Sequence, residues 1–183
     1  LQAGRRVDEA IVTFRQALEA RHDFADARFN LGIAELLSGD WEAGWKNYEA
    51  RWQTDNPVFS PRHAGIPLWN GEVLKGKTLL LYAEQGYGDT IQFCRYAPLF
   101  ADRGAARMIL ECQPGLKTVM QTLHGSADVI EQGEPVPVAD FRLPLLSAPM
   151  HFHTTPVTVP GNCLSVPDLP GLQDLPGQSS GQY

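Results

Sequence analysis

One short apolar run, followed at once by two glycines, constrains the fold of this chain more than any other stretch. Residues 78–83 (TLLLYA) show no polar alternation, which is typical of a strand buried on both faces of a sheet. Residues 84–89 (EQGYGD) interrupt the run, and from Thr90 onward apolar residues recur at helical spacing. We therefore predict a strand, a tight glycine turn and a helix. Ligands of open α/β sheets bind at the carboxyl ends of the strands, so a functional site is expected in this turn.

The elements that follow continue the same alternation. We predict helices over residues 90–103 and 115–123, strands over 106–112 and 128–131, and either a strand or a short helix over 141–147. Pro98 lacks a backbone donor and should kink or restart the first of these helices. The order of strands and helices predicts a parallel sheet with right-handed crossovers.

The amino-terminal residues 1–52 contain an internal repeat with a period of about 34 residues. Val7 aligns with Trp41 under this shift, and each follows a glycine turn. Asp40 is well placed to cap a helix, and the small residues Gly32 and Gly44 would let two helices approach closely. We predict helical hairpins here, of which the first lacks its leading helix.

Prolines and glycines mark two boundaries in the chain. Residues 53–77 form a predicted linker of local turns, in which Trp69 is expected to pack between the helices and the following domain. Residues 159–183 are rich in Gly, Pro, Ser and Gln, and we predict a disordered tail there. Because the chain begins in the middle of a predicted helix, we expect it to be a fragment of a longer protein.

Composition excludes several classes of function. A net charge of −6 and a pI near 5.3, without any basic stripe, argue against nucleic-acid binding. No apolar run approaches the roughly 20 residues of a membrane span. The three cysteines stand far apart and are expected to be reduced, which favours a cytoplasmic location. His151 and His153 would share a face of a strand, but no third ligand is evident, so we predict surface histidines and no metal.

Two groups of residues carry a resemblance to known families. Residues 30–32 (NLG), 39–41 (GDW) and 48–49 (YE) resemble the tetratricopeptide (TPR) repeat, of which about one and a half repeats are present. Residues 79–99 (LLLYAEQGYGDTIQFCRYAPL), with residues 69–71 (WNG) and 144–149 (PLLSAP), resemble bacterial TPR proteins that carry a glycosyltransferase-like domain. That domain is similar to the heptosyltransferases of the GT-B fold.

This resemblance implies a fold and an activity. The implied fold is α plus α/β, with TPR hairpins over 1–52, a linker over 53–77 and a Rossmann-like parallel-sheet domain over 78–158 that forms the amino-terminal half of a GT-B enzyme. The parent protein would transfer a sugar from a nucleotide-sugar donor to an unknown sugar, glycan or protein acceptor, with no metal or other cofactor. The half that binds the donor is not expected in this chain, so the chain alone should be inactive.

The resemblance also assigns roles to residues of the turn. The loop aspartate of the heptosyltransferase-like family is held to be the general base, and by position this residue is Asp89. An aspartate directly before Thr90 is also a good helix N-cap, and this alternative stays open. The residues expected to bind substrate are Glu84, Gln85, Gly86, Gly88 and Arg95.

Two other functions compete with sugar transfer. The chain would be a non-catalytic scaffold if the repeat binds a partner protein through its groove. It would be a nucleotide-binding protein if the GxG of the turn held a phosphate group. Ile91 occupies the position of the third glycine in the GxGxxG dinucleotide-binding motif, and there is no Walker lysine. The sequence therefore supports nucleotide binding less than it supports the other two functions.

Overall fold

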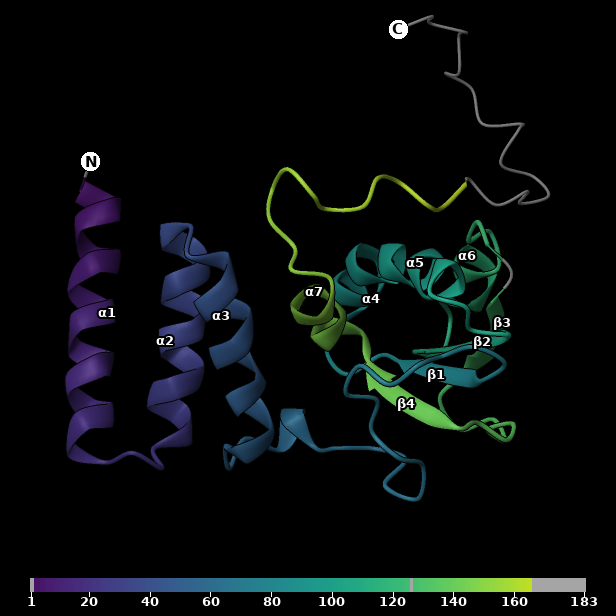
Figure 1. Cartoon of the computed structure of the whole chain (residues 1–183), viewed down its shortest axis with the longest axis horizontal. Helices are drawn as coiled ribbons and strands as arrows, with labels where there is room; N and C mark the ends of the chain where they lie inside the picture. The colour runs from purple at the N-terminus through teal and green to yellow at the C-terminus, as the bar shows by residue number, and fades with distance from the viewer. Residues whose placement is uncertain (1, 126, 166–183) are drawn as a thin grey trace, which may run out of the picture.

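The computed structural model describes residues 2–125 and 127–165, with side chains from residue 6 onward. Three helices at the amino-terminal end stand beside a unit in which helices cover a sheet (Figure 1). The four strands of that sheet are all parallel. The predicted combination of helices followed by a parallel α/β unit is therefore confirmed. Within the described residues, no helix is long and apolar enough to cross a membrane.

The amino-terminal part consists of three helices packed side by side (Figure 1). They are α1 (Gln2–Ala20), α2 (Ala25–Ser38) and α3 (Trp41–Tyr48), and the 3₁₀ turn η1 (Glu49–Gln53) follows α3. Gly39 ends α2 in the left-handed conformation at φ 95°, which glycine adopts without strain. The carboxylate of Asp40 accepts a hydrogen bond from the Ala43 N–H at 3.3 Å, so the predicted cap of α3 is confirmed.

Helices α2 and α3 approach closely at the two predicted glycines. A Cβ atom added to Gly32 would lie 2.6 Å from the backbone nitrogen of Tyr48, and one added to Gly44 would lie 2.8 Å from the Leu36 side chain. Real Cβ atoms do not come so near backbone atoms, so the distance between these helices depends on the missing side chain at Gly32.

We expect Gly32→Ala to lower the free energy of unfolding by about 2 kcal/mol, because overpacking that displaces backbone typically costs about 1–3 kcal/mol. Gly88→Ala in helix α4 (Tyr87–Phe93) is the matched control, since nothing lies within 4 Å of its added carbon. Gly88 lies in the first turn of α4, where the preference for alanine over glycine is smaller than the roughly 1 kcal/mol of a helix interior, so this control should not lose stability. Urea unfolding followed by circular dichroism measures both. A loss of the same size at both positions would show that the close approach at Gly32 does not matter.

The sheet is built around the strand that the apolar run predicts. Its strands are β1 (Thr78–Tyr82), β2 (Arg107–Cys112), β3 (Ala127–Glu131) and β4 (Phe141–Pro144), in the order β3-β2-β1-β4. Leu80 in β1 pairs with Ile109 on one side and Arg142 on the other. Leu79, Leu80 and Leu81 are fully buried, as a central strand covered on both faces requires.

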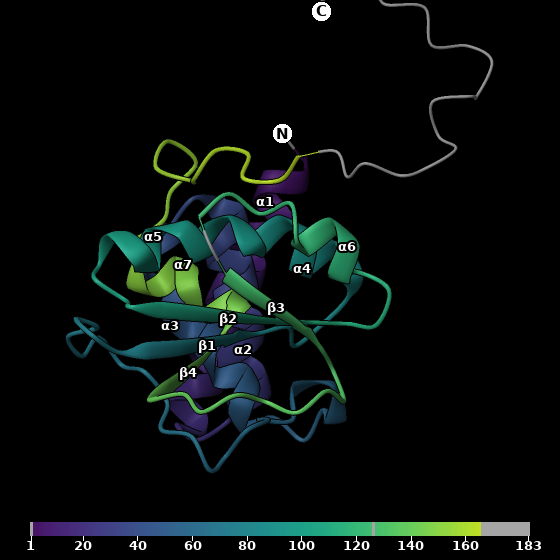
Figure 2. The same cartoon turned by 90° about the vertical axis from the view of Figure 1, so that its right-hand side faces the viewer.

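One face of the sheet is covered by helices (Figure 2). These are α4 (Tyr87–Phe93), the 3₁₀ turn η3 (Cys94–Tyr96), α5 (Ala97–Asp102) and the short α6 (Lys117–Met120). Pro98 lies in the first turn of α5, so the predicted restart of the helix is confirmed. Helix α4 begins three residues earlier than predicted. The helix predicted over 115–123 is only four residues long, and it begins late because Gly115 at φ 88° is outside helical conformation.

The opposite face of the sheet is covered by the linker. Leu68 forms a bridge with Arg142 in β4. The carboxylate of Glu111 in β2 forms an ion pair with Arg62 at 2.8 Å and contacts His63 at 2.9 Å. Trp69 does not pack between the helical part and the α/β unit as predicted. Its ring lies inside the α/β core, where its centroid is 5.3 Å from that of Phe100.

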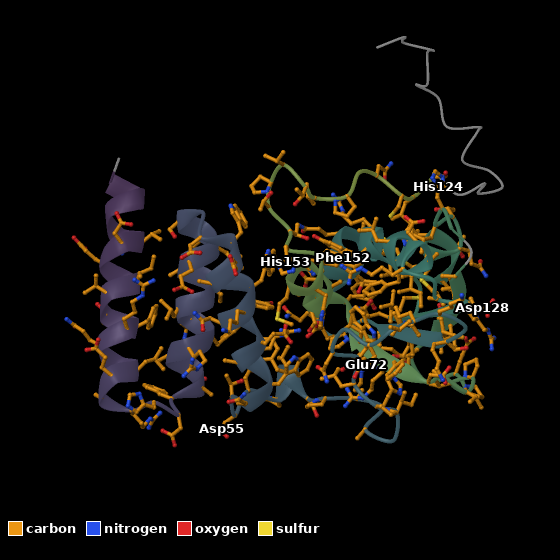
Figure 3. The ribbon with its side chains drawn as sticks, in the orientation of Figure 1. Asp55, Glu72, His124, Asp128, Phe152 and His153 are labelled. Atoms are coloured by element: carbon orange, nitrogen blue, oxygen red, sulfur yellow. The ribbon has the colours of Figure 1, made fainter. Side chains whose placement is uncertain are left out.

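The segment 141–147, predicted as either a strand or a short helix, contains both, because strand β4 ends at Pro144 and a helical turn begins at Leu145. The 3₁₀ turn η4 (Leu145–Ser147) and helix α7 (Ala148–His151) follow the strand. The prediction that His151 and His153 share one face of a strand is wrong. His151 packs on Trp69 with ring centroids 4.6 Å apart, and burial lowers its pKa. Figure 3 shows His153 on the side toward α3, with Phe152 turned toward the α/β core.

Residues 160–165, which fall within the predicted disordered tail, pack on the α/β unit. Cys163 is buried with its Sγ 3.8 Å from that of Cys94, and its carbonyl accepts from the His124 N–H at 2.8 Å. The three cysteines are free, as predicted. Cys163 packs into the core beside Cys94 of η3, a contact that composition does not reveal. The rest of the predicted tail, residues 166–183, lies outside the described residues.

Candidate functional site

The turn after β1 lies at the carboxyl edge of the sheet and leads directly into α4. Gly86 precedes the helix, and its N–H donates to Asp89 Oδ2 at 2.9 Å. Asp89 is therefore the third residue of the helix and satisfies the backbone donor of Gly86 from inside the first turn. The prediction that Asp89 occupies the N-cap position is wrong by three residues, although its carboxylate does cap the helix. Within the described residues, no group donates a hydrogen bond to Asp89 Oδ1.

A pocket of about 360 Å³ opens beside Asp89, between the helical part and the α/β unit. Its lining is aromatic and aliphatic, apart from one carboxylate and one amide, and comprises Ile33, Leu36, Leu37, Trp41, Trp45, Tyr48, Asp89, Gln92, Phe93 and Leu146. Among the described residues, Asp89 is the one acidic group in this lining. A single half-buried carboxylate thus faces a largely apolar space, where electrostatic interactions are stronger than in bulk water.

The aromatic side chains of the pocket are held in place by hydrogen bonds at their polar ends. Trp45 Nε1 donates to the carbonyl of Thr154 at 2.9 Å, and Gln85 Nε2 donates to Tyr48 Oη at 2.8 Å. The Trp45 ring is nearly perpendicular to that of Tyr48, at 82°, and to that of Phe93, at 88°. These contacts hold rings from both parts of the chain against one another, so the two parts share the pocket wall.

Glu84 lies beneath the turn, in a buried ion pair. Its carboxylate accepts from Arg51 Nε at 2.9 Å, from Arg51 Nη2 at 3.0 Å and from the Leu146 N–H at 3.0 Å. Arg51 is fully buried and also reaches Glu49 at 2.5 Å and Ser147 Oγ at 2.8 Å. Burial raises the pKa of Glu84, against the opposing effect of the Arg51 guanidinium. Both oxygens of Glu84 are thus occupied by protein donors, which places this residue in the interface and not in the pocket.

Of the other residues predicted to bind substrate, some lie near the pocket and one, Arg95, lies away from it. Gln85 lies at the pocket edge, where its carbonyl accepts from Gln113 Nε2 at 2.7 Å. Gly86 and Gly88 are exposed in the turn. Arg95 lies beyond α4, and its guanidinium donates to the carbonyls of Gln92 and Pro160. The structure therefore brings Gln85, Gly86 and Asp89 together, and it holds Arg95 apart from them with two carbonyl partners of its own.

The aromatic wall was not predicted as part of a site. Trp41, Trp45 and Tyr48 recur at intervals of four and three residues, so they lie on one face of α3. That spacing could have identified an aromatic face on this helix. Nothing in the spacing shows that the face is turned toward Asp89, because the other wall comes from a distant part of the chain.

A metal site is not found in the part of the chain that the structure describes. No group of three or more His, Cys, Asp or Glu side chains lies close enough there to hold an ion. The chemistry available in the pocket is that of a carboxylate, an amide and aromatic faces.

Comparison with known proteins gives one similarity. No protein-family model matches the chain, and no solved structure matches it. Over 81 residues the chain is 35% identical to Protein FlbA of Caulobacter vibrioides. The match covers 42% of this chain but only 13% of the length of FlbA. The chain is thus similar to a short segment of a much longer protein.

Proposed function

We propose that the chain is part of a TPR-containing glycosyltransferase, which transfers a sugar from a nucleotide-sugar donor to an acceptor hydroxyl. In this proposal the parallel sheet is the amino-terminal half of a GT-B enzyme, and the pocket beside Asp89 receives the acceptor. The observation that carries the proposal is a carboxylate with one oxygen free of protein donors, placed at the carboxyl edge of a parallel sheet.

The chemistry of sugar transfer fits this arrangement. Transfer with inversion needs a base that takes the proton of the acceptor hydroxyl as that hydroxyl attacks the anomeric carbon and the bond from this carbon to the nucleoside diphosphate breaks. The Gly86 N–H holds one oxygen of Asp89, which orients the carboxylate and leaves Oδ1 for the acceptor. The indole and phenol rings of α3 offer apolar faces against which a sugar ring or an apolar side chain can pack.

In this proposal the helical repeat contributes directly to the site. Helices α2 and α3 supply Ile33, Trp41, Trp45 and Tyr48 to the pocket that α4 completes with Asp89. The three free cysteines agree with a reducing compartment such as the cytoplasm.

A non-catalytic scaffold is the second candidate. Ile33 and Leu37 are exposed at the rim of the pocket, with 36% and 72% of their surface accessible. Exposed aliphatic side chains beside a groove are typical of a surface that binds a partner protein. In this alternative the pocket holds a side chain of the partner and no transfer takes place.

A transfer assay on the protein extended past both ends of this chain separates the two candidates. We expect the extended protein to release the nucleoside diphosphate from one member of a panel of nucleotide sugars when acceptor is present. In this proposal the donor binds to the second half of the enzyme, so we expect the 183 residues alone to release none. Absence of turnover with every donor, together with capture of a partner by the helices, would favour the scaffold.

A further inference from the structure

A second pocket lies on the face of the sheet that the linker covers. It has a volume of about 160 Å³ and is lined by Trp52, Pro61, Leu68, Tyr82, Arg142 and Pro144. Leu79 and Leu81 pack among the helices on the opposite face, and side chains alternate along a strand, so Tyr82 points into the linker side. Tyr82 pairs with Pro144 at the carboxyl ends of β1 and β4. This pocket is thus at the edge of the sheet where ligands bind, but it does not include Asp89.

Two donors in this pocket have no acceptor among the described residues. Arg142 donates from Nε to the Ile66 carbonyl at 2.8 Å and from Nη1 to Tyr82 Oη at 3.2 Å. Within the described residues, no group accepts from Arg142 Nη2, and no carboxylate lies within ion-pair distance of its guanidinium. The Tyr82 hydroxyl accepts from Arg142, and no described group accepts its hydrogen. Tyr82 is 1% exposed, and a buried donor without an acceptor is costly.

The charges around the pocket favour an anion. The Arg62 guanidinium lies 5.3 Å from the centroid of the Tyr82 ring, although it is paired with Glu111. Glu84 is the other nearby carboxylate, and Arg51 neutralises it. Burial raises the pKa of Tyr82, so the hydroxyl keeps its hydrogen at neutral pH. Arg142 is therefore a cation without a carboxylate, beside a hydroxyl that can donate.

We propose that this pocket binds a small oxyanion, a carboxylate or a phosphate group, through the guanidinium of Arg142 and the hydroxyl of Tyr82. An arginine fork and a hydroxyl are the donors that recognise such groups in proteins. The indole of Trp52 forms an apolar wall for the molecule that bears the anion. This proposal does not depend on sugar transfer, because it uses none of the residues of the Asp89 pocket.

Titration of the full chain with inorganic phosphate and, separately, with acetate tests the proposal. Ionic strength is held constant, and the indole N–H resonance of Trp52, assigned from Trp52→Phe, is followed by NMR. We expect saturation with at least one anion, and the anion that saturates identifies the class. Arg142→Gln should weaken the affinity about tenfold or more, because it removes a charge-assisted hydrogen bond.

Two further variants make the test decisive. Arg107→Gln removes the same charge from strand β2, which is separated from β4 by β1 and lies outside the pocket, and it should leave the affinity unchanged. Tyr82→Phe removes only the hydroxyl and should weaken binding several-fold, which decides the matter if Arg142→Gln does not fold. Failure of both anions to saturate, equal effects of Arg142→Gln and Arg107→Gln, or unchanged binding by Tyr82→Phe would overturn the proposal.

Discussion

Replacing Asp89 with asparagine in the protein extended at both ends is expected to lower the turnover number for sugar transfer by about 10²- to 10⁴-fold. Asparagine keeps an oxygen that can accept from the Gly86 N–H, so the first turn of α4 is preserved. Its amide oxygen cannot take the proton of the acceptor hydroxyl. The change thus separates the two roles of the side chain, because the cap is retained and the base is lost.

Steady-state kinetics and thermal unfolding should be measured on the same preparations. Asp140→Asn is the matched control, since the carboxylate of Asp140 also accepts from a backbone N–H, that of Thr78, at 2.8 Å. Asp140 lies beside the amino end of β1, at the opposite end of the strand from the turn. Replacing its carboxylate with an amide should therefore leave the turnover number unchanged. If Asp89→Asn retains the turnover of the wild type, Asp89 only caps the helix and another base must be sought.

The sequence was sufficient to predict the α/β unit because its signals are local. An apolar run of strand length, glycines after it and a helical period beyond them are read from neighbouring residues, and the structure confirms the parallel sheet that they predict. The predicted restart of a helix at Pro98 and the predicted cap by Asp40 also depend on neighbouring residues, and the structure confirms both. The prediction failed where a short pattern fits two structures. His151 and His153 have the spacing of a strand, but α7 ends at His151 and His153 follows it.

The candidate site could be predicted only in part, because most of its contacts join distant segments. The position of Asp89 in a glycine turn after a strand is visible in the sequence. That the aromatic face of α3 meets this turn is not visible, since the approach depends on Trp45 reaching Thr154 and Tyr48 reaching Gln85. The burial of Glu84 against Arg51 is hidden for the same reason. A charged residue next to a glycine turn suggests exposure when only its neighbours are considered.

Replacing Arg51 with methionine is expected to lower the free energy of unfolding by about 3–5 kcal/mol. Arg51 is fully buried, and its guanidinium faces the carboxylates of Glu84 and Glu49. Methionine fills much of the same volume but leaves both carboxylates without their counter-charge, and Glu84 has only 2% of its side chain exposed. Removal of one partner from a buried ion pair is costly because Glu84 stays out of water and keeps only the Leu146 N–H as a donor.

Urea denaturation of the full chain measures this loss of stability, and two further variants identify its cause. Arg107→Met removes an arginine whose ion pair with Asp128 is about half exposed, and it should cost at most about 1 kcal/mol. The double variant Arg51→Met/Glu84→Gln should be more stable than Arg51→Met alone, because the glutamine is neutral and its oxygen still accepts from the Leu146 N–H. If the double variant is no more stable, the loss comes from the packing of Arg51 on Tyr48 and Trp52. A loss relieved by the double variant would show that the ion pair between Arg51 of η1 and Glu84 of the turn stabilises the contact between the helical part and the α/β unit.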